Sequence, residues 1–140
     1  AIEQAVTIPL LHIADATAEQ LTADGITRVG LLGTRFTMEQ DFYIGRLEKQ
    51  FGIEVVVPDQ SERDTIHRVI FDELCQGRVE DVSRQRYLAI IDSLHAHGAQ
   101  AVILGCTEIA MLVGQRDTKV PLYDTTALHA QRAVAWALND

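Results

Sequence analysis

The chain has 140 residues, a hydrophobic fraction of 47% and a formal net charge of −8. This length suits one domain with a sizeable core. The negative charge argues against nucleic acid and anionic membrane as partners, and no apolar run approaches the ~20 residues of a membrane-spanning helix. The two cysteines stand in unrelated contexts, which favours reduced thiols in a cytoplasmic protein over a disulfide framework.

Apolar runs and helical patterns alternate along the chain, and turn residues separate them. The runs expected to form strands are 7–13, 27–33, 53–57, 101–104 and 120–123. The segments expected to form helices are 15–23, 38–50, 61–76 with Ser61 as the cap, 82–96, a stretch from 108 onward, and 125–138. This alternation predicts an α/β fold, in which a parallel sheet carries helices on both faces and residues 1–140 form a single unit.

The most informative stretch runs from Ala101 to Met111, where an apolar run stops at Gly105 and helix-forming residues follow. A buried parallel strand with a reactive side chain at its carboxyl end has this pattern, and ligands bind beyond such ends. The N-terminus of the following helix, which Thr107 can cap, is expected to lower the pKa of the Cys106 thiol from about 8.5. Alternatively, Cys106 is a small buried core residue.

Hydroxyl or carboxylate side chains follow three of the expected strands. They lie in Gly33-Thr34, Cys106-Thr107-Glu108 and Asp124-Thr125-Thr126. In a doubly wound sheet these ends open on one rim, where hydroxyls and helix N-termini can hold a carboxylate. Simple helix capping is the alternative role of the threonines. Glu108 either complements the helix dipole or positions Cys106 or a substrate ammonium.

Other chemically capable residues form no pattern of their own. No closely spaced group of His, Cys and carboxylate residues predicts a metal site, and His12 is expected to be structural. Gly30 and Gly33 do not have the G-x-G-x-x-G spacing, and no P-loop occurs, so nucleotide binding is not expected. Cys75 lies at the end of a helix, where the dipole disfavours thiolate, and we assign it to packing.

Three segments resemble the aspartate/glutamate racemases, which are cofactor-independent amino-acid racemases. They are LLGTRFTM at 31–38, VILGCTEI at 102–109 and PLYDTT at 121–126, in the family's order. The resemblance implies a flavodoxin-like lobe of a two-lobed fold, with the active site in the cleft between the lobes. It also implies that Cys106 is one catalytic acid/base and that Thr34, Thr37 and Thr107 line or bind the substrate. Glu108 stands where relatives that act on glutamate usually have histidine.

The activity implied by this resemblance is racemisation of aspartate or glutamate by two cysteines, without pyridoxal phosphate or another cofactor, often in a homodimer. The first cysteine of such enzymes, in a Cys-Asn-Thr context, has no counterpart here. Residues 1–5 read like the end of a helix, so we expect the front of the enzyme to precede Ala1. The chain would then hold the C-terminal lobe with flanking pieces, and by itself would show weak turnover or none.

Two other functions stay open at this point. The sequence also resembles, more loosely, single-cysteine decarboxylases and maleate isomerases of the same superfamily. In a decarboxylase one protonating cysteine suffices. A non-catalytic module that binds a small carboxylate belongs to another class. Release of CO₂ from substituted malonates would separate a decarboxylase from a racemase. Replacing Cys106 by serine separates catalysis from pure binding, because it should abolish proton exchange at Cα and leave the ligand affinity of a binding module almost unchanged.

Overall fold

The computed structural model describes residues 15–39, 41–125 and 128. Within these residues, β1 (Arg28–Leu32), β2 (Glu54–Val56), β3 (Ala101–Leu104) and β4 (Leu122–Asp124) form one sheet in the order β2-β1-β3-β4. All three pairings are parallel, as the sequence predicts. The expected strand at 7–13, His12, and nearly all of the expected last helix lie outside the described residues.

Helices connect the strands. They are α2 (Arg35–Glu39), α3 (Asp41–Phe51), α4 (Gln60–Asp72), α5 (Asp81–Ala96) and α6 (Ile109–Leu112), with the 3₁₀ turns η1 (Leu74–Gln76) and η2 (Gln115–Asp117). Residues 15–23 are also helical. The expected helix at 38–50 is wrong in its start, because α2 begins at Arg35; residue 40, between α2 and α3, lies outside the described residues.

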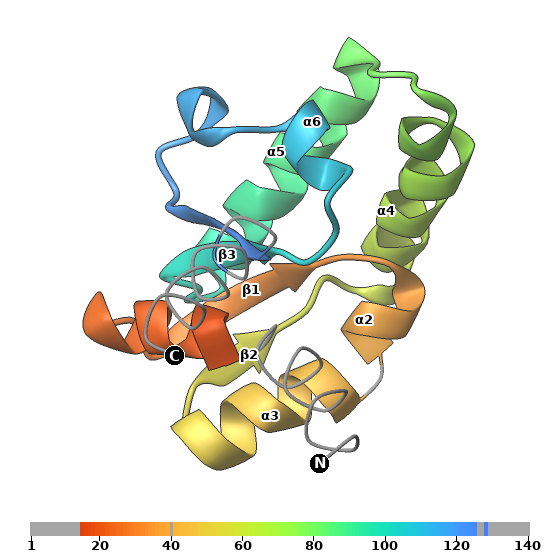
Figure 1. Cartoon of the computed structure of the whole chain (residues 1–140). Helices are drawn as coiled ribbons and strands as arrows, with labels where there is room; N and C mark the ends of the chain where they lie inside the picture. Colours follow the sequence, from red (N-terminus) through yellow and green to blue (C-terminus); the bar gives the residue numbers. More distant parts are fainter. Residues whose placement is uncertain (1–14, 40, 126–127, 129–140) are drawn as a thin grey trace, which may run out of the picture.

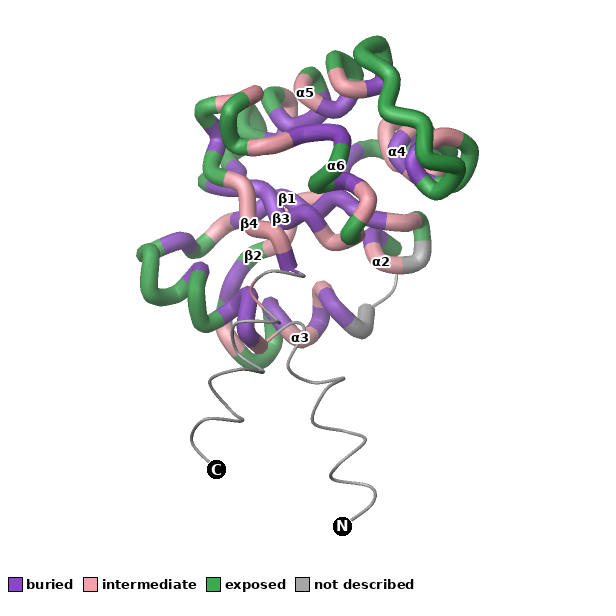
Figure 2. Tube along the Cα trace, turned by 45° about the horizontal axis from the view of Figure 1, so that its top comes forward, coloured by how far each residue is buried: buried purple, intermediate pink, exposed green. Residues whose placement is uncertain are grey.

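The sheet lies between two helical layers (Figures 1 and 2). Strand side chains alternate between the two faces. Leu31 and Ile103 belong to a core cluster with the helical segment 15–23 and with α3, whereas Leu32 and Leu104 belong to a second cluster with α4 and α5. The prediction of helices on both faces is therefore confirmed.

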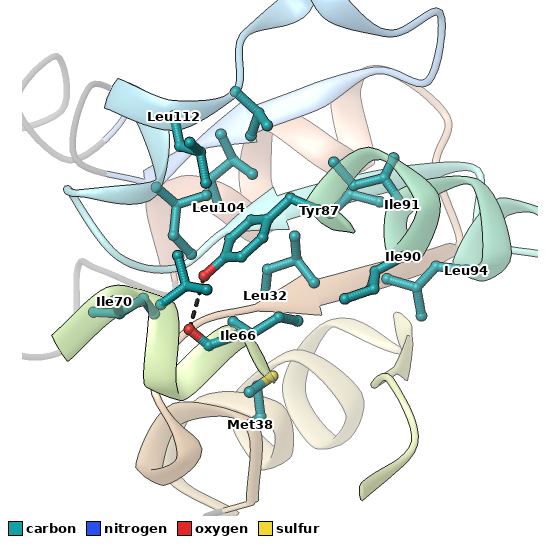
Figure 3. Close-up of a cluster of buried hydrophobic side chains, with 14 of the residues drawn as sticks. Leu32, Met38, Ile66, Ile70, Tyr87, Ile90, Ile91, Leu94, Leu104 and Leu112 are labelled. Atoms are coloured by element: carbon teal, nitrogen blue, oxygen red, sulfur yellow. Dashed lines mark hydrogen bonds between the residues drawn. The ribbon is translucent and has the colours of Figure 1, made fainter. Parts of the chain in front are cut away.

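The second core cluster centres on Tyr87 of α5, which is fully buried (Figure 3). Its hydroxyl donates a 2.7 Å hydrogen bond to the carbonyl oxygen of Ile66 in α4. A buried phenol needs such a partner, because an unsatisfied polar group in the core costs about 1–3 kcal/mol. This bond ties α4 to α5 on one face of the sheet.

The cap of α4 differs from the expected Ser61. Asp59 is the N-cap, and its carboxylate accepts a 2.8 Å hydrogen bond from the backbone N–H of Glu62. The Glu62 side chain accepts in return from the N–H of Asp59, which completes a capping box. Ser61 lies inside the helix because the carboxylate two residues earlier already satisfies the exposed donors.

Candidate active site

The reactive residues lie at the carboxyl edge of the central strands. Leu32 of β1 pairs with Leu104 of β3, and Leu104 pairs with Asp124 of β4. The N–H of Gly105 extends this pairing by one step, with a 2.7 Å hydrogen bond to the carbonyl oxygen of Leu32. The three predicted strand ends therefore meet at one edge of the sheet.

Thr37 of α2 packs over the two glycines that follow β1 and β3. A Cβ atom added at Gly33 would lie 3.1 Å from the Thr37 methyl carbon, and one added at Gly105 would lie 3.4 Å from the same atom. The Gly105 position would also bring that Cβ to 2.8 Å from the carbonyl oxygen of Leu32, closer than real Cβ contacts allow. The absence of a side chain at Gly105 thus lets Thr37 of α2 pack close to the backbone that leads into Cys106.

The hydroxyls of Thr34 and Thr37 lie side by side. Their Oγ1 atoms are 3.2 Å apart, and the Thr34 hydroxyl also accepts a 3.3 Å hydrogen bond from the backbone N–H of Thr37. Thr34 therefore caps α2, which is the structural role considered for it. A hydroxyl can donate and accept at once, so capping does not remove the pair's ability to bind a ligand oxygen.

Cys106 is half-buried, directly after β3, and its thiol donates a 2.9 Å hydrogen bond to Oε2 of Glu108. Burial, followed by the bond to this carboxylate, raises the pKa of Cys106 to about 11. The same bond lowers the pKa of Glu108. The expected lowering of the Cys106 pKa is therefore wrong, although the N–H groups of Glu108 and Ile109 do act in that direction.

The helix after Cys106 explains this outcome. α6 has four residues, and its N-cap is Glu108, so neither Thr107 nor Cys106 caps it. A single turn of helix aligns few peptide dipoles, and the contribution of its amides is smaller than the effects of burial and of the nearby carboxylate. Thr107 is exposed at this turn.

Two residues of α4 hold the start of α2, and the sequence did not single them out. The backbone N–H of Arg35 donates a 2.8 Å hydrogen bond to Nδ1 of His67, and the Arg35 guanidinium lies 2.9 Å from Oδ1 of Asp64. Asp64 and His67 are three residues apart, and this spacing places both on one side of a helix. That spacing is the only signal in the sequence that could have indicated a shared role.

The remaining candidates lie elsewhere or form no site. Cys75 is exposed in η1, so the expectation that it packs in the interior is wrong. In the part of the chain that the structure describes, no three His, Cys, Asp or Glu side chains are grouped so that they could hold a metal ion. Over the same residues, no helix has the length and apolar character that a bilayer crossing requires.

Two cavities lie away from Cys106. One, of about 460 Å³, is lined by Leu88, Asp92, His95, Asp117, Thr118, Lys119, Val120 and Pro121. The other, of about 320 Å³, is lined by Arg28, Val56, Val57, Pro58, Asp59, Glu62, Ser93, Leu94 and His97. Neither is lined by Cys106, Thr34 or Thr37, so chemistry rather than cavity size identifies the candidate site.

Comparison with known proteins assigns the chain to a family. Residues 1–133 match the Asp/Glu/Hydantoin racemase family, and the chain belongs to that family of isomerases. It is also 26% identical over 139 residues to an uncharacterized protein from the pnlA 3′ region of Pectobacterium carotovorum subsp. carotovorum, covering 96% of this chain and 89% of that protein.

Solved structures share both the fold and part of the sequence. A candidate Asp/Glu racemase from Yersinia pestis is 52% identical with a TM-score of 0.88, over 91% of this chain and 56% of that one. An aspartate racemase homologue from Pyrococcus horikoshii OT3 is 36% identical with a TM-score of 0.81, over 89% and 54%. The chain thus spans about half the length of these solved relatives, consistent with one lobe of the racemase fold.

Proposed function

We propose that this chain supplies one proton-transfer face of a cofactor-independent racemase that acts on aspartate, glutamate or a similar small amino acid. The contact between the Cys106 thiol and the Glu108 carboxylate, at the carboxyl end of β3, carries this proposal. The hydroxyls of Thr34 and Thr37 at the neighbouring strand end can hold the substrate carboxylate. Thr107, exposed beside Cys106, is proposed as a further donor.

The activities for which the solved relatives are named support an acidic amino acid as the substrate. The Pyrococcus protein is described as an aspartate racemase homologue, and a Picrophilus torridus aspartate racemase is 28% identical with a TM-score of 0.65. A Francisella tularensis glutamate racemase, solved in complex with D-glutamate, shares the fold at 18% identity and a TM-score of 0.61. An acidic amino acid is therefore the substrate that we propose to test first.

The resting state of Cys106 indicates how the proton moves. A pKa of about 11 keeps this thiol protonated near neutral pH, so we assign it as the proton donor to the Cα carbanion. The S–H bond breaks as the Cα–H bond forms, and the thiolate keeps the electron pair. In the reverse direction the thiolate takes the α-proton. Hydrogen bonds to the substrate carboxylate stabilise the charge that develops between these steps.

A second acid/base group must act on the opposite face of Cα. The chain contains two cysteines, Cys75 and Cys106. Cys75 is exposed in η1, in a sequence context unlike either racemase cysteine motif, so we propose that the second group comes from outside these 140 residues. The greater length of the solved relatives supports this proposal.

Deuterium incorporation at Cα tests the proposal. In heavy water, the chain should exchange the α-proton of aspartate or glutamate slowly, whereas Cys106→Ser should lose this exchange. Cys75→Ser is the matched control, and it should exchange like the parent chain because Cys75 is an exposed thiol in η1. Exchange that survives Cys106→Ser would contradict the proposal. Lack of exchange in a longer protein that includes the second acid/base group would contradict it too.

A single-cysteine decarboxylase is the second candidate, because a thiol kept protonated suits an enzyme that only delivers a proton. In that reaction a C–C bond breaks, CO₂ leaves, and the electron pair remaining on Cα takes the proton of Cys106. Substituted malonates are suitable probes. Release of CO₂ that depends on Cys106, without exchange at Cα of amino acids, would favour this function over racemisation.

A further inference from the structure

We infer that His67 is a positioning residue that holds the ligand-binding end of α2 in place only while its ring is neutral. The inference extends the proposed function, because it depends on Thr34 and Thr37 binding the substrate. The 2.8 Å hydrogen bond from the backbone N–H of Arg35 to Nδ1 of His67 carries it. Arg35 is the first residue of α2, directly after Thr34.

α2 needs this support at its first turn. The first N–H groups of any helix have no acceptor within it, and Arg35 is the first residue of α2. α4 supplies two contacts to the first residue, since His67 accepts from the Arg35 backbone and Asp64 pairs with its guanidinium. The start of α2 is therefore held from α4.

The position of Arg35 affects the residues at the carboxyl end of β3 through Thr34 and Thr37. Thr34 precedes Arg35, and its hydroxyl contacts both the N–H and the hydroxyl of Thr37. The Thr37 methyl lies 3.1 Å and 3.4 Å from the positions that Cβ atoms at Gly33 and Gly105 would take, and Gly105 precedes Cys106. Loosening the Arg35 backbone should therefore shift the two hydroxyls relative to the thiol.

The hydrogen bond depends on the protonation of His67. The Arg35 N–H is a donor, so Nδ1 must carry a lone pair and the ring proton must be on Nε2. A charged imidazole has a proton on both nitrogens, which would place two donors against each other. Histidine side chains generally take up this proton between about pH 8 and pH 5.

The charged or titratable groups on α4 and on the elements packed against it include three ion pairs, Arg35–Asp64, Arg63–Glu39 and Arg68–Glu73. They also include Glu62 and Asp72 of α4, Cys75 of η1, and Arg84 and the buried Tyr87 of α5. The His67 ring also contacts Phe71, with ring centroids 4.7 Å apart. Histidine is the side chain that ordinarily changes charge between pH 5 and pH 8, so loss of the neutral acceptor, rather than a change in a neighbouring charge, is the expected consequence of acidification.

Nuclear magnetic resonance tests the inference directly, without any need for turnover. The backbone amide resonance of Arg35 should shift with pH, with the same midpoint as the ring resonance of His67. His67→Asn places an amide oxygen near the position of Nδ1 and cannot titrate, so its Arg35 amide should stay constant over that range. His97→Asn is the control, because His97 is exposed and contacts Ser93 instead. An Arg35 amide resonance that does not shift as the His67 ring resonance shifts would overturn the inference.

Ligand binding separates this inference from the proposed function. With L- and D-aspartate and L- and D-glutamate as probes, affinity should fall on the order of tenfold between about pH 8 and pH 5.5 in the parent chain, and should stay constant in His67→Asn. Equal affinity at both pH values would overturn the positioning role. If no probe binds at either pH while the Arg35 amide still follows His67, the proposed substrate fails and the contact to α2 stands.

Discussion

The thiol of Cys106 donates a hydrogen bond to the carboxylate of Glu108 across 2.9 Å, only two residues along the chain. A carboxylate that accepts from the thiol loses this bond, and faces a like charge, when the thiol ionises. The pair therefore keeps one negative charge on Glu108 and the proton on Cys106. In this arrangement Cys106 is ready to donate a proton, and it can act as a base only after it has lost that proton.

Glu108→Gln should lower the pKa of Cys106 from about 11, because it removes the charged acceptor that stabilises the thiol. The pKa should remain above that of a free thiol, since burial is the larger cause. The rise of thiolate absorbance with pH, measured in a Cys75→Ser background, checks this. Alkylation near pH 8 should speed up severalfold, because one pKa unit changes the thiolate fraction about tenfold.

Glu80→Gln is the control for this measurement, because Glu80 is exposed and pairs with Arg78 at the start of α5. It should leave the thiol titration unchanged. A Cys106 pKa that stays constant in Glu108→Gln would mean that this carboxylate does not face the sulfur in solution.

Gly105→Ala should destabilise the fold by about 1–3 kcal/mol, the usual cost of inserting an atom into a packed region. Its Cβ would lie 2.8 Å from the carbonyl oxygen of Leu32, a backbone atom held in the β1–β3 pairing. Urea denaturation measures the change in the free energy of unfolding. Gly114→Ala is the matched control, because no atom lies within 4 Å of its added Cβ, and it should cost less than about 0.5 kcal/mol.

Most of the sheet could be predicted from the sequence because its strands are short apolar runs bounded by turn residues. The carboxyl ends of β1, β3 and β4 meet as expected, since parallel neighbours must end at one edge. Residues 15–23 form the expected helix, and the following Gly25 has a φ of 75°, which glycine adopts easily.

The chemistry of the site was less predictable because it depends on where side chains point. The Cys106 pKa was predicted in the wrong direction, since neither the shortness of α6 nor the burial of the sulfur can be read from local sequence. The contact between His67 and Arg35 joins residues 32 positions apart, so it depends on how α4 packs against α2. Such contacts require the tertiary structure.

Thr37→Val should weaken binding of aspartate or glutamate by about tenfold or more, because a hydrogen bond to a charged group contributes about 1.5–3 kcal/mol. Valine keeps the methyl that packs near Gly33 and Gly105 and loses the hydrogen bond to the Thr34 hydroxyl, so the free energy of unfolding should fall by about 0.5–1.5 kcal/mol. Calorimetric titration checks the affinity. Thr65→Val is the control, since its hydroxyl donates a hydrogen bond to the Ser61 carbonyl within α4. Unchanged binding in Thr37→Val would contradict the proposed ligand role.

The three tyrosines of the chain should resist ionisation in the folded state. Burial raises the pKa of Tyr43 and of Tyr123 to about 12, and burial, followed by the effect of Cys106, also raises that of Tyr87. Absorbance of tyrosinate should therefore stay low near pH 11 in the folded chain, whereas the chain in denaturant should titrate near pH 10.

These raised pKa values also determine how stability depends on alkaline pH. A tyrosine with a folded pKa above its unfolded value of about 10 contributes stability that is fully present below pH 10 and is lost as pH rises toward 12. Urea midpoints should thus fall between about pH 10 and pH 12. Tyr43→Phe should reduce this fall, because it removes a buried phenol that donates a hydrogen bond to the Thr17 hydroxyl. An equally steep fall in Tyr43→Phe would assign the alkaline loss to other groups.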